Sequence, residues 1–238
     1  YDTNRLVLDR ASYTNAQEGV SLGRLPDGHT NLVAFSLSPS PGTANYLPND
    51  RGVLLHEVLA RNLTHHAPAS GRVADWIELC NPTSNTVALS GMSLSVNERH
   101  PGQWIVPADV SLDAGKCLTV WCDSTRPASL TNEPELCCGQ ELSDSGGGVY
   151  LFDTEGRLVD GVLYGFQLPD QSFGRVHGNW TLLTQPTPGA ADAAPADLGD
   201  PANVRLNEWL ADGDAHDWIE LYNLDTRPVN MAGMILTD

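Results

Sequence analysis

Basic side chains are scarce in this sequence. It has 30 acidic residues against 13 lysines and arginines, for a formal net charge of −17, and Lys116 is the single lysine. Binding a phosphate backbone requires clustered Lys and Arg, so we expect no nucleic-acid partner. The acidic residues are spread along the chain, which is typical of a solvated surface. We therefore expect no cofactor, and the alternative is an acidic surface that binds Ca²⁺ weakly.

Long apolar runs are absent as well. The chain has no uninterrupted apolar stretch of the roughly 18 residues that a spanning helix needs, so we expect no membrane span. Hydrophobic residues still make up 41% of the chain, which is enough for packed cores. The 22 glycines and 16 prolines divide these residues into short runs, a pattern that predicts many short strands and no long helix.

Cysteine is sparse and irregularly spaced. An odd number without a C-x-x-C pair argues against a zinc site and against a regular disulfide framework. The count allows one disulfide, but the sequence does not identify the pair. The five cysteines are Cys80, Cys117, Cys122, Cys137 and Cys138.

Internal repetition is the strongest signal in the chain. Three blocks, 55–60, 75–81 and 87–92, recur in the same order as 206–211, 217–223 and 229–234. The middle block reads Asp75-Trp-Ile-Glu-Leu-Cys-Asn81 in one copy and Asp217-Trp-Ile-Glu-Leu-Tyr-Asn223 in the other. A second set of blocks, 5–7, 21–24 and 39–45, recurs as 157–159, 172–175 and 186–192.

These repeats predict one complete unit between two incomplete ones. We expect residues 1–46 to be the C-terminal part of a first module and 52–192 to be a complete module. Residues 203–238 are then the N-terminal part of a third module, and the Pro- and Ala-rich stretch 193–202 is a semi-extended linker. Both end pieces would have open sheet edges, and the sequence leaves open whether they pair with each other.

Alternating residues place strands in the complete unit. The expected strands are 53–59, 76–80, 87–89, 92–96, 103–106, 117–122, 149–152 and 158–164. Period-two alternation puts Leu55, Glu57 and Leu59 on the inward face, and puts Trp76 and Glu78 opposite the core. Short strands separated by turn residues predict an all-β, immunoglobulin-like antiparallel sandwich.

The repeated Asp-Trp-Ile-Glu-Leu-x-Asn block carries a family resemblance. With the upstream Leu-x-Glu, the downstream Leu-x-Gly, Trp121-Cys-Asp, Ser172-Phe-Gly-Arg175 and Pro-Thr-Pro-Gly, it resembles the lamin-tail domain family. It is most similar to the branch found as tandem repeats in large secreted bacterial proteins. The resemblance implies an immunoglobulin-like sandwich without catalysis of its own. Cys80 departs from the pattern, since an aromatic such as Tyr222 is more usual there.

Glu57 and Glu208 are the first candidate site residues. The alternation places each on the apolar face of a strand, where a charge is costly unless it is paired or hydrogen-bonded. We expect a structural role, in which the carboxylate accepts backbone N–H bonds or pairs with Arg175. No second carboxylate stands at a fixed spacing to share acid–base work, so we expect no catalysis.

A second candidate group is Asp75, Glu78 and Asn81, repeated as Asp217, Glu220 and Asn223. With Asp123 or Asp153, these oxygen ligands would suit calcium. We favour the alternative that the Asp and Asn cap the two ends of a strand through side-chain-to-backbone bonds. We therefore assign no metal site.

Tryptophans mark the remaining candidate surface. Trp76 and Trp218 point away from the core by alternation, and such aromatics either cover the second face of a sheet or bind a ligand. We expect the 123–141 loop to cover Trp76.

The sequence predicts a non-catalytic extracellular array that tethers or positions another domain of a larger secreted protein. Its partner would be a protein or a cell-surface polymer, or another domain of the same chain. One alternative is an accessory fragment of a secreted hydrolase or kinase whose catalytic domain lies outside this window. Another is a carbohydrate-binding module, which requires an exposed aromatic platform.

Overall fold

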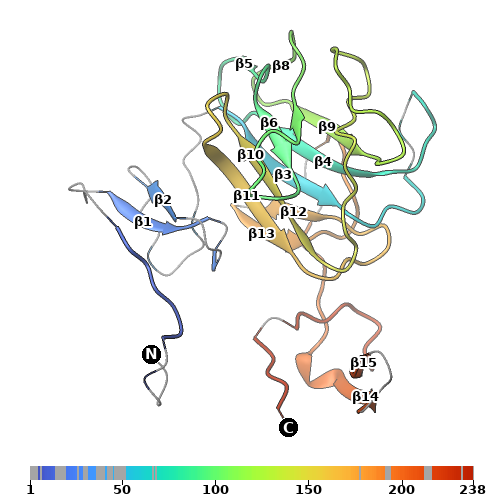
Figure 1. Ribbon diagram of the computed structural model, residues 1–238. Coiled ribbons are helices and arrows are strands. Elements are labelled where there is room, and N and C mark those ends of the chain that lie inside the picture. Colours follow the sequence, from blue (N-terminus) through green and yellow to red (C-terminus); the bar gives the residue numbers. More distant parts are fainter. Residues whose placement is uncertain are drawn as a thin grey trace.

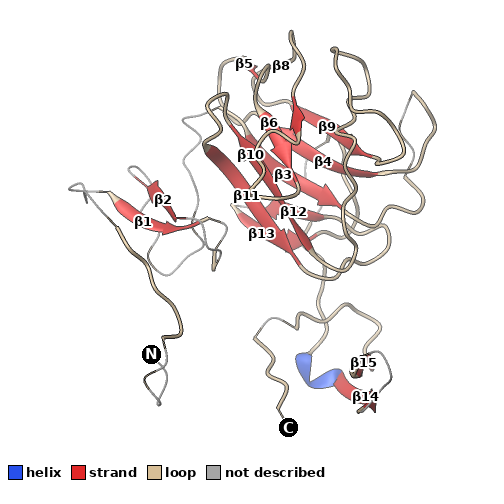
Figure 2. Ribbon diagram, in the orientation of Figure 1, coloured by secondary structure: helices blue, strands red, loops and turns tan. Residues whose placement is uncertain are grey.

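The computed structural model is all-β in the residues that it describes (Figure 1, Figure 2). These are residues 52–65, 67, 69–176, 178–190, 194–211, 216–231 and 233–237, with 5, 7–13, 20–25, 27–28, 32–35, 41 and 45 in the first fifty. The repeated block 39–45 therefore lies outside the described residues apart from 41 and 45. No helix in the described part is long and apolar enough to cross a membrane.

A five-stranded antiparallel sheet forms one layer of the central unit. Its spatial order is β13 (Asn179–Leu182), β12 (Phe173–Val176), β3 (Leu54–Leu59), β4 (Asp75–Cys80) and β9 (Cys117–Cys122). The sequence predicts β3, β4 and β9 within one residue at each end. It identifies residues 172–175 as a motif but does not predict β12 and β13 as strands.

A four-stranded antiparallel sheet forms the second layer. Its order is β11 (Leu158–Tyr164), β10 (Gly147–Phe152), β6 (Ser93–Ser95) and β7 (Trp104–Ile105). A short pair, β5 (Val87–Ala88) with β8 (Ser111–Leu112), closes one end. One apolar cluster contains Leu55, Ile77 and Val120 of the first sheet together with Leu94 and Leu151 of the second. Two sheets that share one core make a β-sandwich, so the predicted immunoglobulin-like fold class is confirmed.

A smaller cluster covers the outer side of the five-stranded sheet. Trp76 and Leu59 are fully buried there, and they pack with Ala67 and Trp121. Ala67 belongs to the loop between β3 and β4, and the backbone N–H of Ser70 in that loop donates to Glu135 Oε1 (3.1 Å). The 61–74 loop therefore contributes to the cover that we expected from the 123–141 segment alone.

A β-bulge corrects the face predicted for Glu57. The β3–β4 register shifts between Leu55 and Glu57, so that Glu57 lies opposite Glu78 while Val58 lies opposite Ile77. An extra residue at a bulge reverses the facing of all the residues beyond it. Leu55 and Val58 consequently face the main core, and the prediction that Glu57 and Leu59 point inward was wrong. Ile77 and Leu79 do face the core, as predicted.

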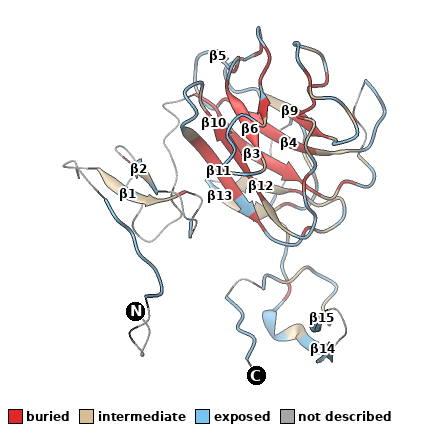
Figure 3. Ribbon diagram, viewed as in Figure 1, coloured by how far each residue is buried: buried red, intermediate tan, exposed pale blue. Residues whose placement is uncertain are grey.

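Two further hairpins flank the central unit in the chain, β1 (Ser21–Arg24) with β2 (Leu32–Phe35), and β14 (Val204–Leu210) with β15 (Trp218–Asn223). A single 3₁₀ turn (Pro201–Asn203) precedes β14. Each pair forms a separate two-stranded sheet, and no ladder joins them in the described residues. Figure 3 shows that β14 and β15 are exposed, in contrast to the buried strands of the sandwich.

The β14–β15 hairpin repeats the register of β3–β4. Both hairpins carry their bulge at the same place in the repeat, between Leu55 and Glu57 and between Leu206 and Glu208. The matching cross-strand pairs are Leu55–Leu79 with Leu206–Leu221, Glu57–Glu78 with Glu208–Glu220, and Leu59–Trp76 with Leu210–Trp218. The sequence repeat is therefore also a repeat of backbone geometry.

The stretch predicted as a linker is hydrogen-bonded on both sides. The N–H of Ala196 donates to Leu182 O of β13 (2.8 Å), and the N–H of Gly199 donates to Pro228 O beyond β15 (2.8 Å). Backbone bonds of this kind restrict the freedom that an unbonded Pro-rich spacer would have.

Candidate functional site

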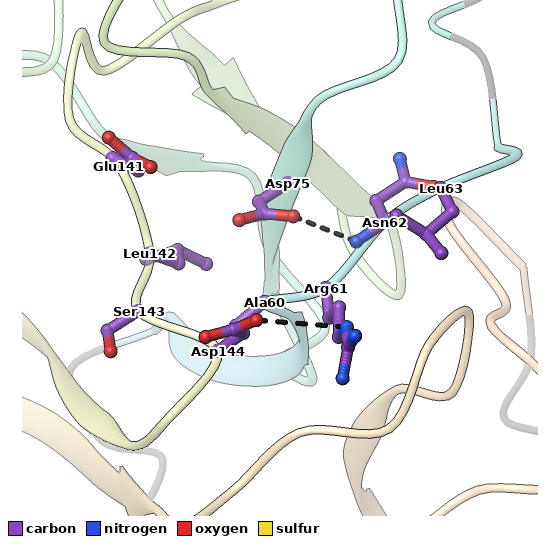
Figure 4. Close-up of a pocket in the computed structure, with 9 residues that line it drawn as sticks. All are labelled: Ala60, Arg61, Asn62, Leu63, Asp75, Glu141, Leu142, Ser143 and Asp144. Atoms are coloured by element: carbon purple, nitrogen blue, oxygen red, sulfur yellow. Dashed lines mark hydrogen bonds and ion pairs between the residues drawn. The ribbon is translucent and has the colours of Figure 1, made fainter.

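An acidic cleft lies beside the first residue of β4 (Figure 4). Its volume is ≈ 580 Å³, and its lining is Ala60, Arg61, Asn62, Leu63, Asp75, Glu141, Leu142, Ser143 and Asp144. Asp75 Oδ1 accepts the backbone N–H of Asn62 (2.9 Å), and Arg61 Nε lies 3.7 Å from Asp144 Oδ2. The cleft thus combines three carboxylates with one guanidinium.

The pKa of Asp75 is raised to about 6, chiefly by burial and to a smaller extent by the nearby charges of Glu141 and Asp144, while the hydrogen bond from Asn62 acts to lower it. A carboxyl group with such a pKa can exchange protons near neutral pH. A general base must also lie within hydrogen-bond distance of the group that it deprotonates. Among the described residues, Asp75 accepts a hydrogen bond from the backbone N–H of Asn62 and from no nucleophilic side chain. The bond to Asn62 is the strand-end contact that we expected of Asp75.

Glu57 is fully buried between β3 and the segment that follows β13. Its carboxylate accepts the backbone N–H of Thr187 (2.9 Å) and the hydroxyl of Thr187 (2.7 Å). Burial nevertheless raises its pKa, and the charge of Glu78 adds to that effect. Of the two partners expected for Glu57, the structure shows the backbone N–H and not Arg175.

Arg175 pairs with Asp160 instead. Its Nη2 donates to both Asp160 carboxylate oxygens (2.9 Å each), and Asp160 Oδ2 also accepts the N–H of Leu55 (3.0 Å). This network joins β12 and β3 of one sheet to β11 of the other. Arg175 also lies over the Trp180 ring, with its Cζ 5.0 Å from the ring centroid. The sequence missed this pair because Asp160 sits in an apolar run without any distinguishing spacing.

Glu78 is the fully buried neighbour of Glu57 on the same outer face. Its Oε1 lies 3.0 Å from His56 Nδ1 and 3.5 Å from Cys80 Sγ, and its Oε2 accepts the N–H of Gly189. Cys80 forms a disulfide with Cys117 across the β4–β9 pair. The single disulfide that the sequence allowed is therefore this one.

Asn81 organises the turn after β4. Its Nδ2 donates to the carbonyl of Asn85 (2.8 Å), and its Oδ1 accepts the N–H of Thr83 (3.0 Å). Asn223 repeats both bonds, to the carbonyl of Arg227 (2.8 Å) and from the N–H of Asp225 (2.9 Å). Both asparagines therefore cap the ends of their strands.

The structure does not assemble the calcium set considered above. Asp75 and Asn81 stand at opposite ends of β4, about 20 Å apart at the usual rise per residue, and Glu78 faces the other side of the sheet from Asp75. Asp123 pairs with Arg72 of the loop before β4, and Asp153 pairs with Arg157 of its own turn.

The remaining predicted residues belong to the exposed β14–β15 hairpin. Glu208 lies opposite Glu220, and Glu220 Oε1 accepts a bond from Asn207. Asp217 precedes β15, and Trp218 is 43% exposed, whereas its counterpart Trp76 is fully buried.

Together these features define a class of protein: an immunoglobulin-like β-sandwich module in which the buried carboxylates of Glu57, Glu78 and Asp160 bond within the fold. Residues 51–166 match the family model of the Lamin Tail Domain. This part of the chain belongs to the lamin tail domain family, whose members are non-enzymatic immunoglobulin-like domains. A comparison with curated proteins found no match. The family match ends before β12, although β12 is hydrogen-bonded to β3 and completes the same sheet.

Proposed function

We propose that this chain is part of a non-catalytic array of repeated lamin-tail modules that spaces and positions another domain of a larger secreted bacterial protein. The shared register and shared bulge of the β3–β4 and β14–β15 hairpins carry this proposal. Two stretches of one chain that fold with the same pairing are what a tandem array requires.

A spacer must also hold its neighbours apart in a defined way. The bonds from Ala196 to β13 and from Gly199 to Pro228 tie the connecting segment at both ends. Pro195 and Pro201 further limit its conformations. These contacts support a semi-rigid connection over a flexible tether.

The Cys80–Cys117 disulfide supports an extracellular or cell-surface location, because such bonds persist in oxidising compartments. The net charge of −17 favours partners other than nucleic acid. We propose a protein or a cell-surface polymer as the partner of the array.

Hydrogen–deuterium exchange on the full chain tests the spacer. We expect slow exchange at the amides of Ala196 and Gly199, at rates comparable with those of β13 and β14. Exchange at unfolded-chain rates in both amides would show a flexible tether and contradict the semi-rigid connection. Saturable binding of the labelled chain to cell-wall polymer or to surface protein would then identify the partner class.

The carbohydrate-binding alternative has little support from the central unit. Trp76, Trp104 and Trp121 are buried there, and Trp180 lies partly beneath Arg175. An aromatic platform for sugar stacking requires exposed ring faces. We therefore keep the array as the proposed function, with a catalytic domain elsewhere in the parent protein as the alternative context.

A further inference from the structure

Four side chains of metal-ligand type converge on the outer face of the five-stranded sheet. They are His56 of β3, Glu78 and Cys80 of β4, and Cys117 of β9, and one ligand atom from each lies within 4.8 Å of all the others. The Nδ1 of His56 faces Glu78 Oε1 at 3.0 Å. We propose that the reduced form of this cluster is a binding site for Zn²⁺.

The donor set suits zinc. Two thiolates, one imidazole and one carboxylate make a four-ligand set of the kind that binds Zn²⁺ tetrahedrally, with bonds of about 2.0–2.3 Å. Donor atoms around such an ion are about 3–4 Å apart, so atoms already within 4.8 Å of one another need only small side-chain movements. The ligands come from three strands, which is why cysteine spacing in the sequence gave no sign of a zinc site.

The β3 bulge creates the geometry, and the residue types supply the chemistry. In the β14–β15 hairpin the same bulge brings Asn207 onto Glu220, as it brings His56 onto Glu78. Asn207 and Tyr222 are the counterparts of His56 and Cys80, and neither offers a strong zinc donor. The central unit therefore carries ligand-type residues at positions where its repeat carries structural ones.

The local charge also favours a cation. Glu57 and Glu78 are both fully buried and lie opposite each other across β3 and β4. Two buried carboxylates repel each other, and a divalent ion beside Glu78 relieves that repulsion directly.

The thiol–disulfide state controls the site. A small dithiol reduces the Cys80–Cys117 bond: its two sulfurs form a new disulfide, and the two cysteines each gain one electron and one proton. Zn²⁺ then binds the two sulfurs and releases both protons, since thiolates are the ligands. Thiol–disulfide exchange with a small disulfide reverses this step: the Cys80–Cys117 bond forms again, the small disulfide is reduced to two thiols, and the ion loses two of its four donors and is released.

Co²⁺ titration of the full chain tests the proposal. The chain is reduced with dithiothreitol, freed of it without air, and titrated beside an untreated sample. We expect one Co²⁺ per reduced chain, with thiolate charge-transfer and tetrahedral d–d absorption that Zn²⁺ abolishes, and no such signal from the oxidised chain. This comparison uses the unaltered sequence, so it does not depend on a variant folding.

Matched variants assign the ligands. The His56→Asn variant, which places the residue of the β14–β15 repeat at this position, should bind Co²⁺ at least roughly tenfold more weakly. The Cys122→Ser/Cys138→Ser pair should leave the spectrum unchanged, whereas Cys80→Ser/Cys117→Ser should abolish it. Absence of Co²⁺ binding by the reduced chain, or a spectrum that survives loss of Cys80 and Cys117, would overturn the proposal.

Discussion

Replacing Arg175 by Met tests whether the Asp160 network holds the two sheets together. Arg175 and Asp160 are both largely buried, with side-chain exposures of 13% and 7%. Removing one partner of a buried pair typically costs about 3–5 kcal/mol, because the other charge is left uncompensated. Asp160 keeps the N–H groups of Leu55 and Gly161 as donors, so we expect the lower end, about 3 kcal/mol.

The loss should depend on pH in a defined direction. Burial raises the pKa of Asp160 even in the presence of Arg175, which lowers it, and without Arg175 the pKa rises further. A carboxyl group whose native pKa is raised stabilises the fold while it is protonated, and that stability is lost as the pH rises through the native pKa. The cost of Arg175→Met should therefore be largest near pH 7.5 and smaller near pH 4.5.

Urea unfolding of the wild type and two variants measures this. The free energy of unfolding is determined at both pH values for Arg175→Met and for Arg175→Met/Asp160→Asn. The double variant should recover part of the loss at pH 7.5, because a neutral amide no longer needs a cation. An equal cost at both pH values, or a double variant no better than the single one, would refute the reasoning.

Three other substitutions give separate tests of the fold, all measured by urea or thermal unfolding. Asp75→Asn should stabilise the protein by about 1–2 kcal/mol at pH 7.5 and have little effect at pH 4, because the cost of the charged carboxyl group develops as the pH rises from its ordinary pKa of 3.8 to the native pKa of about 6, and partial exposure to solvent reduces that cost; no gain at pH 7.5 would contradict it. Cys80→Ser/Cys117→Ser should cost about 4 kcal/mol, as chain entropy predicts for a bridge between residues 37 apart, and an unchanged midpoint would refute this role. Gly174→Ala should cost about 1–3 kcal/mol, because the added Cβ would stand 2.6 Å from Cδ1 of the buried Leu183, the residue after β13. Gly165→Ala is the control, since its Cβ would meet nothing within 4 Å and the change should be close to neutral.

The sequence predicted the sandwich because its signals are local. Alternation and turn residues located β3, β4 and β9 to within a residue, and the Asp-Trp-Ile-Glu-Leu block identified the family. The local pattern did not predict the register between β3 and β4. A single bulge after Leu55 moved Glu57 to the opposite face, and no residue in the run marks a bulge.

The partners of buried charges were harder to predict, since they join distant parts of the chain. Thr187 reaches Glu57 across 130 residues, and Asp160 meets the N–H of Leu55 across 105. The Cys80–Cys117 bond likewise depends on β4 and β9 being neighbours in the sheet. Each contact follows from strand order, which spacing within one segment does not contain.

Limited proteolysis of the full chain, read by mass spectrometry, tests the central claim most directly. That claim is a complete module at 52–192 that includes β12 and β13 and has a partial repeat after it. A nonspecific protease should leave a resistant fragment that begins near residue 52 and ends beyond residue 183, with earlier cuts in the exposed β14–β15 hairpin. A resistant fragment that ends near residue 166, where the family match stops, would show that β12 and β13 are not part of the module.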